Sequence, residues 1–339
     1  MFIDMKRLTD KSLKAIIGMI AFAFVIVLVP QSLQAQTLSA KLTDKEIPVS
    51  EFNSLNVSDD FEVTLARGAY GVRLTVDQDL APYVEVYVKA KTLYLSYDEK
   101  SVPKELKKLY KGRNGLTPVF RVVAYTPEIQ SIALSDNASF IGVEEFTSPQ
   151  FELTAIGKSQ VKNLAVTATS AKIILKKNAQ AVMSVKSDRG VEVNTDNNSN
   201  LKLTFTGKEL AVNSEGSSVL VANGEPCERM NIFSSGSSQV SVTADAEKVD
   251  LTTEGSSKVV LTGKGDAMTV KGSRSSSVDA FSMPVKTVEA NLSGATVTVS
   301  VEKEVDVTLL SGSSLYYSGT PDFKIGKIVK STLAPYGTK

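Results

Sequence analysis

The chain lacks two residue types on which many active sites and ligand-binding sites depend. Its 339 residues include no His and no Trp, and aromatic residues make up only 7% of it. Without His, this chain cannot use any mechanism that needs an imidazole as a base, a proton shuttle or a zinc ligand. Without Trp, it also offers little surface on which sugar rings could stack.

Cysteine is nearly absent as well. Cys227 is the single cysteine, so the chain can form no internal disulfide and must be stabilised by burial and backbone hydrogen bonds. A lone thiol can act as a nucleophile, but here no His is present to lower its pKa. We therefore interpret Cys227, which follows Pro226, as a small residue near a bend.

No excess of either charge is present. The chain has 38 Lys and Arg against 37 Asp and Glu. Nucleic-acid-binding proteins need a basic surface to neutralise phosphates. The composition therefore gives no reason to expect nucleic acid as a partner.

The N-terminus predicts export. Lys6 and Lys14 belong to a basic start, an uncharged run spans 15–29, and cleavage is predicted between Ala35 and Gln36. A membrane anchor is the alternative, but this run is shorter than the ~20 residues that span a bilayer. We expect no membrane span after the signal peptide is removed. The mature protein would reside in the periplasm, on the outer-membrane surface or outside the cell.

A recurring turn is the most informative feature of the sequence. Gly-Ser-Ser begins at Gly216, Gly236, Gly255 and Gly312, and the interval between turns is about 19 residues, as in solenoid proteins. Gly tolerates left-handed backbone angles and Asn is the next most tolerant, while the small Ser can bond turn backbone groups. Arg274 breaks this pattern without an explanation from sequence. The predicted turn residues are Asn137, Gly157, Asn178, Asn198, Gly216, Gly236, Gly255, Arg274, Gly294 and Gly312.

Segments of alternating apolar and polar residues flank each turn. In "VDLT", Val249 and Leu251 would point inward and Asp250 outward, and we expect Val259 and Val307 to be buried too. A period of two excludes a helical repeat, and a β-sandwich would need hairpins with strands of similar length. The pattern predicts an all-β fold, a β-solenoid of about ten coils of about 19 residues.

The predicted organisation has four parts. A signal peptide (1–35) precedes a β-rich region (36–128), which is continuous with the solenoid and caps or extends it. The repeats occupy 129–322, and a tail covers 323–339. Within the β-rich region, the polar segment 101–115 predicts a loop or a short helix between strands.

Three stretches resemble a known family: "FNSLNVSDDFEVTLARG" from residue 52, "YTPEIQSIALSDNAS" from 125 and "SGSSLYYSGTPDF" from 311. They are similar to the head GIN domain family of auto-transporter adhesins, exported proteins of Bacteroides-type bacteria. The resemblance covers 45–322 and implies a right-handed parallel β-helix and a role in adhesion. It implies no catalytic or binding residues. Asn137, Asn178 and Asn198 stand where the family usually has glycine.

A polysaccharide-processing enzyme on a β-helix scaffold is the alternative. Such chemistry needs paired carboxylates, or Ca²⁺ near a basic residue, in one cleft. Residues 196–200 have the spacing of a calcium loop, but Leu201 replaces its required Gly, so we interpret them as a turn. Outward acids are instead spread along the chain and interspersed with Lys172 and Lys271, as on a solvated surface. These acids are Glu152, Glu192, Asp250, Glu289 and Asp306.

The sequence therefore predicts an exported, non-catalytic protein of the cell envelope or surface, without a metal or cofactor. A repetitive face would serve binding or adhesion, because weak contacts at successive coils add through avidity. The partner would be an extended ligand, such as a glycan or an envelope or host surface protein. Neither the ligand nor the binding face follows from the sequence.

Overall fold

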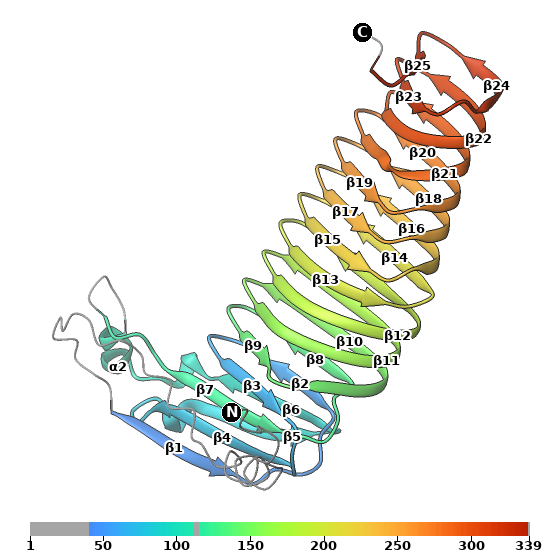
Figure 1. Ribbon diagram of the computed structural model, residues 1–339. Helices are drawn as coiled ribbons and strands as arrows, with labels where there is room; N and C mark the ends of the chain where they lie inside the picture. Colours follow the sequence, from blue (N-terminus) through green and yellow to red (C-terminus); the bar gives the residue numbers. More distant parts are fainter. Residues whose placement is uncertain (1–40, 111–114, 338–339) are drawn as a thin grey trace, which may run out of the picture. The chain divides into compact units, whose positions relative to one another are not determined.

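The computed structural model describes residues 41–110 and 115–337. These residues belong to one compact unit, and strands form nearly all of its regular structure (Figure 1). The predicted signal peptide, with its cleavage site between Ala35 and Gln36, lies outside the described residues. No helix in the described ranges has the length and apolar character needed to cross a membrane.

From residue 131 onward the chain winds into stacked coils (Figure 1). Each coil contributes one strand before the repeated turn and one strand after it. Both pair in parallel with their counterparts in the neighbouring coils. We call the resulting sheets the pre-turn sheet and the post-turn sheet. The predicted β-solenoid of about ten coils is confirmed.

Short strands dominate both sheets. The pre-turn sheet contains β8 (Ser131–Leu134), β14 (Glu209–Ser214), β16 (Cys227–Ser234), β18 (Ala246–Thr253), β20 (Gly265–Ser273) and β24 (Asp322–Ile328). The post-turn sheet contains β9 (Ser139–Gly142), β13 (Asn200–Thr206), β15 (Val219–Gly224), β17 (Gln239–Thr243), β19 (Lys258–Thr262), β23 (Ser314–Ser318) and β25 (Thr332–Pro335). Long strands pass from the post-turn sheet into the pre-turn sheet: β10 (Glu145–Gly157), β11 (Gln160–Lys177), β12 (Gln180–Thr195), β21 (Ser277–Ser293) and β22 (Thr296–Leu310).

The alternating pattern determines which side chains form the core between the two sheets. Val249, Leu251, Val259 and Val307 are each at most 2% exposed, whereas Asp250 lies on the outside and is half-buried. The predicted register is therefore confirmed. Burying a Val or Leu side chain contributes about 1.5–3 kcal/mol, so stacked apolar pairs stabilise every coil.

The turns form a column of left-handed residues that continues from coil to coil. Its six predicted glycines have φ between 70° and 87° (Gly157, Gly216, Gly236, Gly255, Gly294 and Gly312). A Cβ atom added to Gly255 would lie 2.7 Å from the carbonyl oxygen of Gly236. Arg274 occupies the same column with φ of 62°, and its carbonyl oxygen lies 2.8 Å from a Cβ built on Gly294.

In the early coils the left-handed residue stands one position before the predicted asparagine. The predicted turn residues Asn137, Asn178 and Asn198 are therefore wrong by one. The left-handed residues are Asp136, Lys177 and Asn197. The reason is a small buried residue that lies two positions after the left-handed one and fixes the register. Ser199 fills that place in one early coil, just as Ser218 does after Gly216.

Buried serines explain why the chain repeats Gly-Ser-Ser. The first Ser donates its backbone N–H to the glycine of the previous coil, as Ser256 does to the Gly236 carbonyl oxygen at 2.7 Å. The second Ser is fully buried, and Ser257 Oγ donates to the carbonyl oxygen of Ser234 at 3.0 Å. Buried polar groups need such partners. The motif is thus a structural device of the turn.

The N-terminal strands extend both sheets. They are β1 (Leu42–Ile47), β2 (Ser54–Val57), β3 (Glu62–Ala66), β4 (Gly71–Asp77), β5 (Val84–Lys89), β6 (Thr92–Tyr97) and β7 (Phe120–Tyr125). β2 pairs with β6 and with β8 of the first coil, and β3 pairs with β7 and β9. The short helix α2 (Lys104–Leu109) forms within the segment that predicted a loop or a helix.

The solenoid also continues past residue 322. The segment predicted as a tail contains β24 and β25, which pair in parallel with β22 and β23. Beyond them the described chain provides no further strand. Ile325 on β24 is 57% exposed.

Candidate binding surfaces

The outward side of the pre-turn sheet, here the pre-turn face, carries the acids that the sequence singles out. Strand register places them in a single column, in which each residue lies beside its counterpart in the next coil. Lys271 lies in the adjacent outward column, beside Thr252. The column includes Glu152, Lys172, Glu192, Asp250, Glu289 and Asp306.

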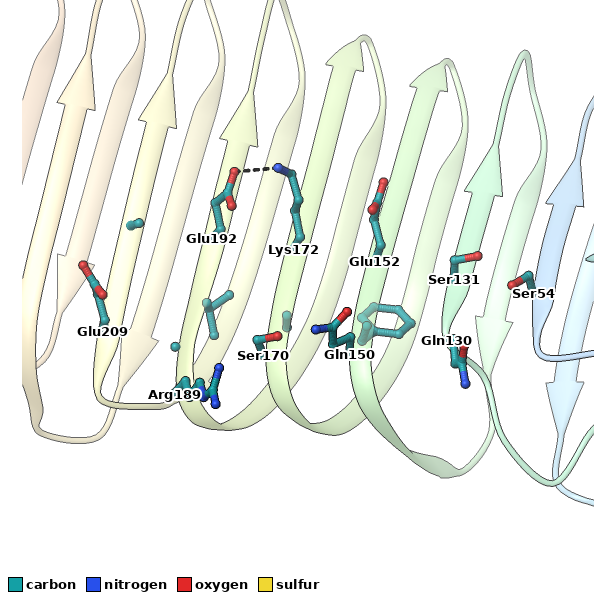
Figure 2. A pocket seen from close by; sticks show the side chains of 15 residues that line it. Ser54, Gln130, Ser131, Gln150, Glu152, Ser170, Lys172, Arg189, Glu192 and Glu209 are labelled. Atoms are coloured by element: carbon teal, nitrogen blue, oxygen red, sulfur yellow. Dashed lines mark ion pairs between the residues drawn. The ribbon is translucent and has the colours of Figure 1, made fainter.

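A shallow groove of about 720 Å³ lies near the N-terminal end of the pre-turn face (Figure 2). Glu152, Lys172 and Glu192 project into it from neighbouring strands, together with Arg189 and Glu209. Glu152 and Glu192 are two coils apart, which corresponds to about 9.6 Å along the stack. The sequence predicts scattered outward acids, whereas in the structure Glu152 and Glu192 share this groove.

An ion pair dominates the chemistry of this groove. Lys172 Nζ lies 2.9 Å from Glu192 Oε1, and Asn194 donates to the same oxygen at 2.8 Å. These contacts hold the pKa of Glu192 below its usual value, and Glu192 raises the pKa of Lys172. A general acid at neutral pH needs a carboxyl whose pKa is raised. Glu192 is instead a fixed negative charge, which does not suit acid catalysis.

Other charges on the pre-turn face also pair with one another. Asp250 Oδ2 lies 3.3 Å from Lys248 Nζ and 3.7 Å from Arg229 Nε. Farther along, Lys324 Nζ lies 2.7 Å from Glu304 Oε1. This face therefore offers mixed charges that largely neutralise each other.

The outward side of the post-turn sheet, here the post-turn face, has a different composition. Its short strands β9, β13, β15, β17 and β19 contain no Asp or Glu, and Glu145 of β10 is the one acid in the post-turn parts of the long strands β10, β11 and β12. One outward column consists largely of amides, namely Gln160, Gln180, Asn200 and Gln239. The next column mixes lysines with aliphatic residues that are 37% to 48% exposed, namely Ile141, Lys162, Val182, Lys202, Val221 and Val260.

Sequence reasoning missed this surface, although a signal for it was present. The segments "QVK", "QAV", "NLK", "VLV", "QVS" and "KVV" align when each follows its turn, and their first and third residues point outward. Composition alone does not distinguish outward valines from inward ones, so the exposed valines are not recognised without the alignment of the coils.

Cys227 lies near the bend that leads into β16 and is only 7% exposed. Its Sγ is 3.6 Å from the carbonyl oxygen of Asp245. Burial raises the pKa of the thiol to about 11, so it stays protonated at neutral pH. A protonated, buried thiol is a poor nucleophile, which agrees with the interpretation of Cys227 as a small packing residue.

Candidate metal ligands do not cluster in the part of the chain that the structure describes. No three Asp, Glu, His or Cys residues come together there in a way that could hold an ion. Residues 196–200 form a turn, as interpreted from the sequence. In that turn the Asp196 carboxylate accepts the Asn197 N–H at 2.6 Å, and Asn198 Nδ2 donates to Asn178 Oδ1 at 3.4 Å.

A comparison with protein families now relates this solenoid to known proteins. The model described as "Putative auto-transporter adhesin, head GIN domain" matches residues 51–244 and 226–321. The chain belongs to this family. Its matched segments extend from β2 to the end of the last Gly-Ser-Ser unit, so the family covers both faces. A search of curated proteins finds no match.

Solved structures of similar proteins come from Parabacteroides and Bacteroides species. A "putative adhesin" from Parabacteroides merdae is 17% identical, with 87% of this chain and 96% of that chain covered and a TM-score of 0.35. A "Putative lipid binding protein" from Parabacteroides distasonis is 15% identical, with 87% and 96% covered and a TM-score of 0.34. A "putative adhesin" from Bacteroides fragilis is 16% identical, with 88% and 98% covered and a TM-score of 0.29.

Proposed function

We propose that the mature protein is an exported, non-catalytic binding protein of the cell envelope or surface. Its solenoid presents a repetitive face to an extended ligand, such as a glycan or an envelope or host surface protein. The observation that carries this proposal is the stacking of outward residues into continuous columns over successive coils. Membership of an adhesin family supports it.

Distributed contacts are the expected mode of binding. Each coil contributes a few weak contacts, and a partner that spans several coils gains affinity because these contacts act together. A single change such as Asp250→Ala or Glu289→Ala should therefore weaken binding at most slightly. Changes in several neighbouring coils of the binding face should abolish it. The measurement is equilibrium binding to a panel of extended glycans and surface proteins.

The shared groove gives the enzymatic alternative a specific test. If Glu152 and Glu192 act on a glycan, the purified protein will release products, and Glu192→Gln will reduce turnover by orders of magnitude. The proposal expects no product from any glycan in the panel. Product formation that Glu192→Gln abolishes would contradict it.

Export by the predicted signal peptide can be tested separately from binding. A cleaved signal peptide predicts that the protein from an envelope or secreted fraction starts at Gln36, which intact-mass analysis can show directly. A chain that retains Met1 in a membrane-embedded form would contradict export by this signal.

A further inference from the structure

We infer that the post-turn face is the binding face and that its ligand is an acidic polysaccharide. This inference rests on the proposed binding function and adds to it the face and the chemical class of the partner. It starts from lysines that the fold leaves without a counter-charge.

Three lysines of the post-turn face have no partner of opposite sign. Lys162, Lys202 and Lys258 are exposed, and no ion pair or hydrogen bond holds their side chains among the described residues. Lys186, at the end of the first half of β12, pairs with Glu145 at 3.1 Å. In the post-turn parts of the strands from β9 to β19, Glu145 is the one acid and pairs with Lys186, so Lys162, Lys202 and Lys258 lie on a face with no other acid in its strands.

The pre-turn face differs, because its outward residues include acids such as Glu152, Glu192 and Asp250. There, Lys172 and Lys324 each lie within 2.9 Å of a glutamate in a neighbouring coil. In a stack of parallel strands, an acid in one coil can lie directly beside a lysine in the next. The three post-turn lysines have no such acid, so their positive charge is available to a partner.

The geometry of the lysines suits a polymer. Lys162 and Lys202 lie two coils apart in one outward column, which is about 9.6 Å along the stack. Lys258 follows three coils later, in the neighbouring column beside Gln239. A chain that carries carboxylates at intervals can contact all three, whereas a single small anion can contact only one.

The residues between the lysines indicate sugars as the rest of the ligand. Side-chain amides of Gln160, Gln180, Asn200 and Gln239 donate and accept hydrogen bonds, as sugar hydroxyls require. Val182 and Val221 offer aliphatic surface to the C–H faces of sugar rings. Single-stranded nucleic acid fits less well, because its bases need aromatic side chains to stack on. From β9 to β19, the post-turn aromatics are Phe140, Phe146 and Phe205, and all three are buried.

Binding measurements with the full-length mature protein test this inference. Polygalacturonate provides the acidic polysaccharide, and its methyl-esterified form provides the same backbone without charge. We expect the polyacid to bind more tightly than the ester, with an affinity that falls as salt is added. Monomeric galacturonate should bind far more weakly, because it cannot engage several coils at once.

Two triple variants localise the interaction. Lys162→Gln with Lys202→Gln and Lys258→Gln should weaken binding of polygalacturonate about tenfold, since each exposed charge contributes modestly. The matched control replaces three exposed lysines of the pre-turn strands by Gln, namely Lys176, Lys271 and Lys327, and should change affinity less than about twofold. Equal losses in both variants, or no loss in the first, would overturn the choice of face.

A non-sugar polyanion tests the ligand class. Poly-L-glutamate carries carboxylates without hydroxyls, so Gln180→Ala with Gln239→Ala should weaken binding of polygalacturonate and leave poly-L-glutamate unchanged. Tighter binding of poly-L-glutamate than of polygalacturonate would overturn the assignment to sugars. Binding of a neutral glycan or a protein with no effect of the lysine variant would overturn this inference alone. Turnover of a ligand would instead contradict the proposed function.

Discussion

The pre-turn and post-turn faces are built on the same core yet carry opposite kinds of surface. On the pre-turn face, acids and bases are mixed and several of them pair, as Lys172 and Glu192 do at 2.9 Å. On the post-turn face, lysines stand among amides and exposed valines, and Glu145 is the one acid in the post-turn parts of the strands from β9 to β19. The shared core constrains only inward residues, so the difference between the outward residues reflects something other than folding.

The largest loss of stability is expected in the core that the two sheets enclose together. Val259→Asp on the post-turn side and Val307→Asp on the pre-turn side should each lower the free energy of unfolding by several kcal/mol, because each buries an unpaired carboxylate. Outward Thr252→Asp should cost under ~1 kcal/mol. Chemical denaturation measures all three. Equal effects of the inward and outward substitutions would show that the register is wrong.

The second-largest loss of stability is expected from substitutions in the turn column, which lies between the two faces. Gly255→Val places a β-branched side chain at φ of 72° and within 2.7 Å of a carbonyl oxygen, so we expect a loss of more than about 2 kcal/mol. Arg274→Gly is the control, since Arg274 already adopts φ of 62°, and it should change stability by less than about 1 kcal/mol. A Gly255→Val variant as stable as the parent would remove the steric account of the column.

The smallest loss of stability is expected when an ion pair of the pre-turn face is removed. Contacts with Lys172 lower the pKa of Glu192, so the pair stabilises the fold above the unfolded-state pKa of about 4.3 and ceases to do so as pH falls through the lowered pKa. Lys172→Gln should raise the pKa of Glu192 toward its usual value and lower stability at pH 7 only slightly, because the pair is exposed to solvent. NMR titration of the Glu192 carboxyl measures the shift, with Lys271→Gln as the control. An unchanged pKa in Lys172→Gln would contradict the pairing.

The sequence predicts the solenoid well because the features that define it are local. Alternation at Val249 and Leu251 requires only neighbouring residues, and Gly255 signals a left-handed turn by its type alone. Lys177 and Arg274 show the limit of this reasoning, since stacking against adjacent coils forces residues with no such preference into left-handed angles. A turn of this kind cannot be found from residue type.

The surfaces depend on register between coils, which a single segment does not reveal. Glu152 and Glu192 are 40 residues apart in sequence but share one groove, because their strands align two coils apart. Likewise, the exposure of Val182 and Val221 follows from their position in the pleat. Predicting either surface requires every coil to be aligned on its turn, and the shift of one residue in the early turns prevents that alignment.

Chemical footprinting of lysines tests the central claim most directly, because it reports on both faces in one experiment. The protein is acetylated with and without saturating polygalacturonate, and modification at each lysine is quantified by mass spectrometry. Our account predicts that the ligand protects Lys162, Lys202 and Lys258 while the pre-turn residues Lys176, Lys271 and Lys327 react equally in both samples. Protection of the pre-turn lysines, or of neither set while the polymer is bound, would contradict it.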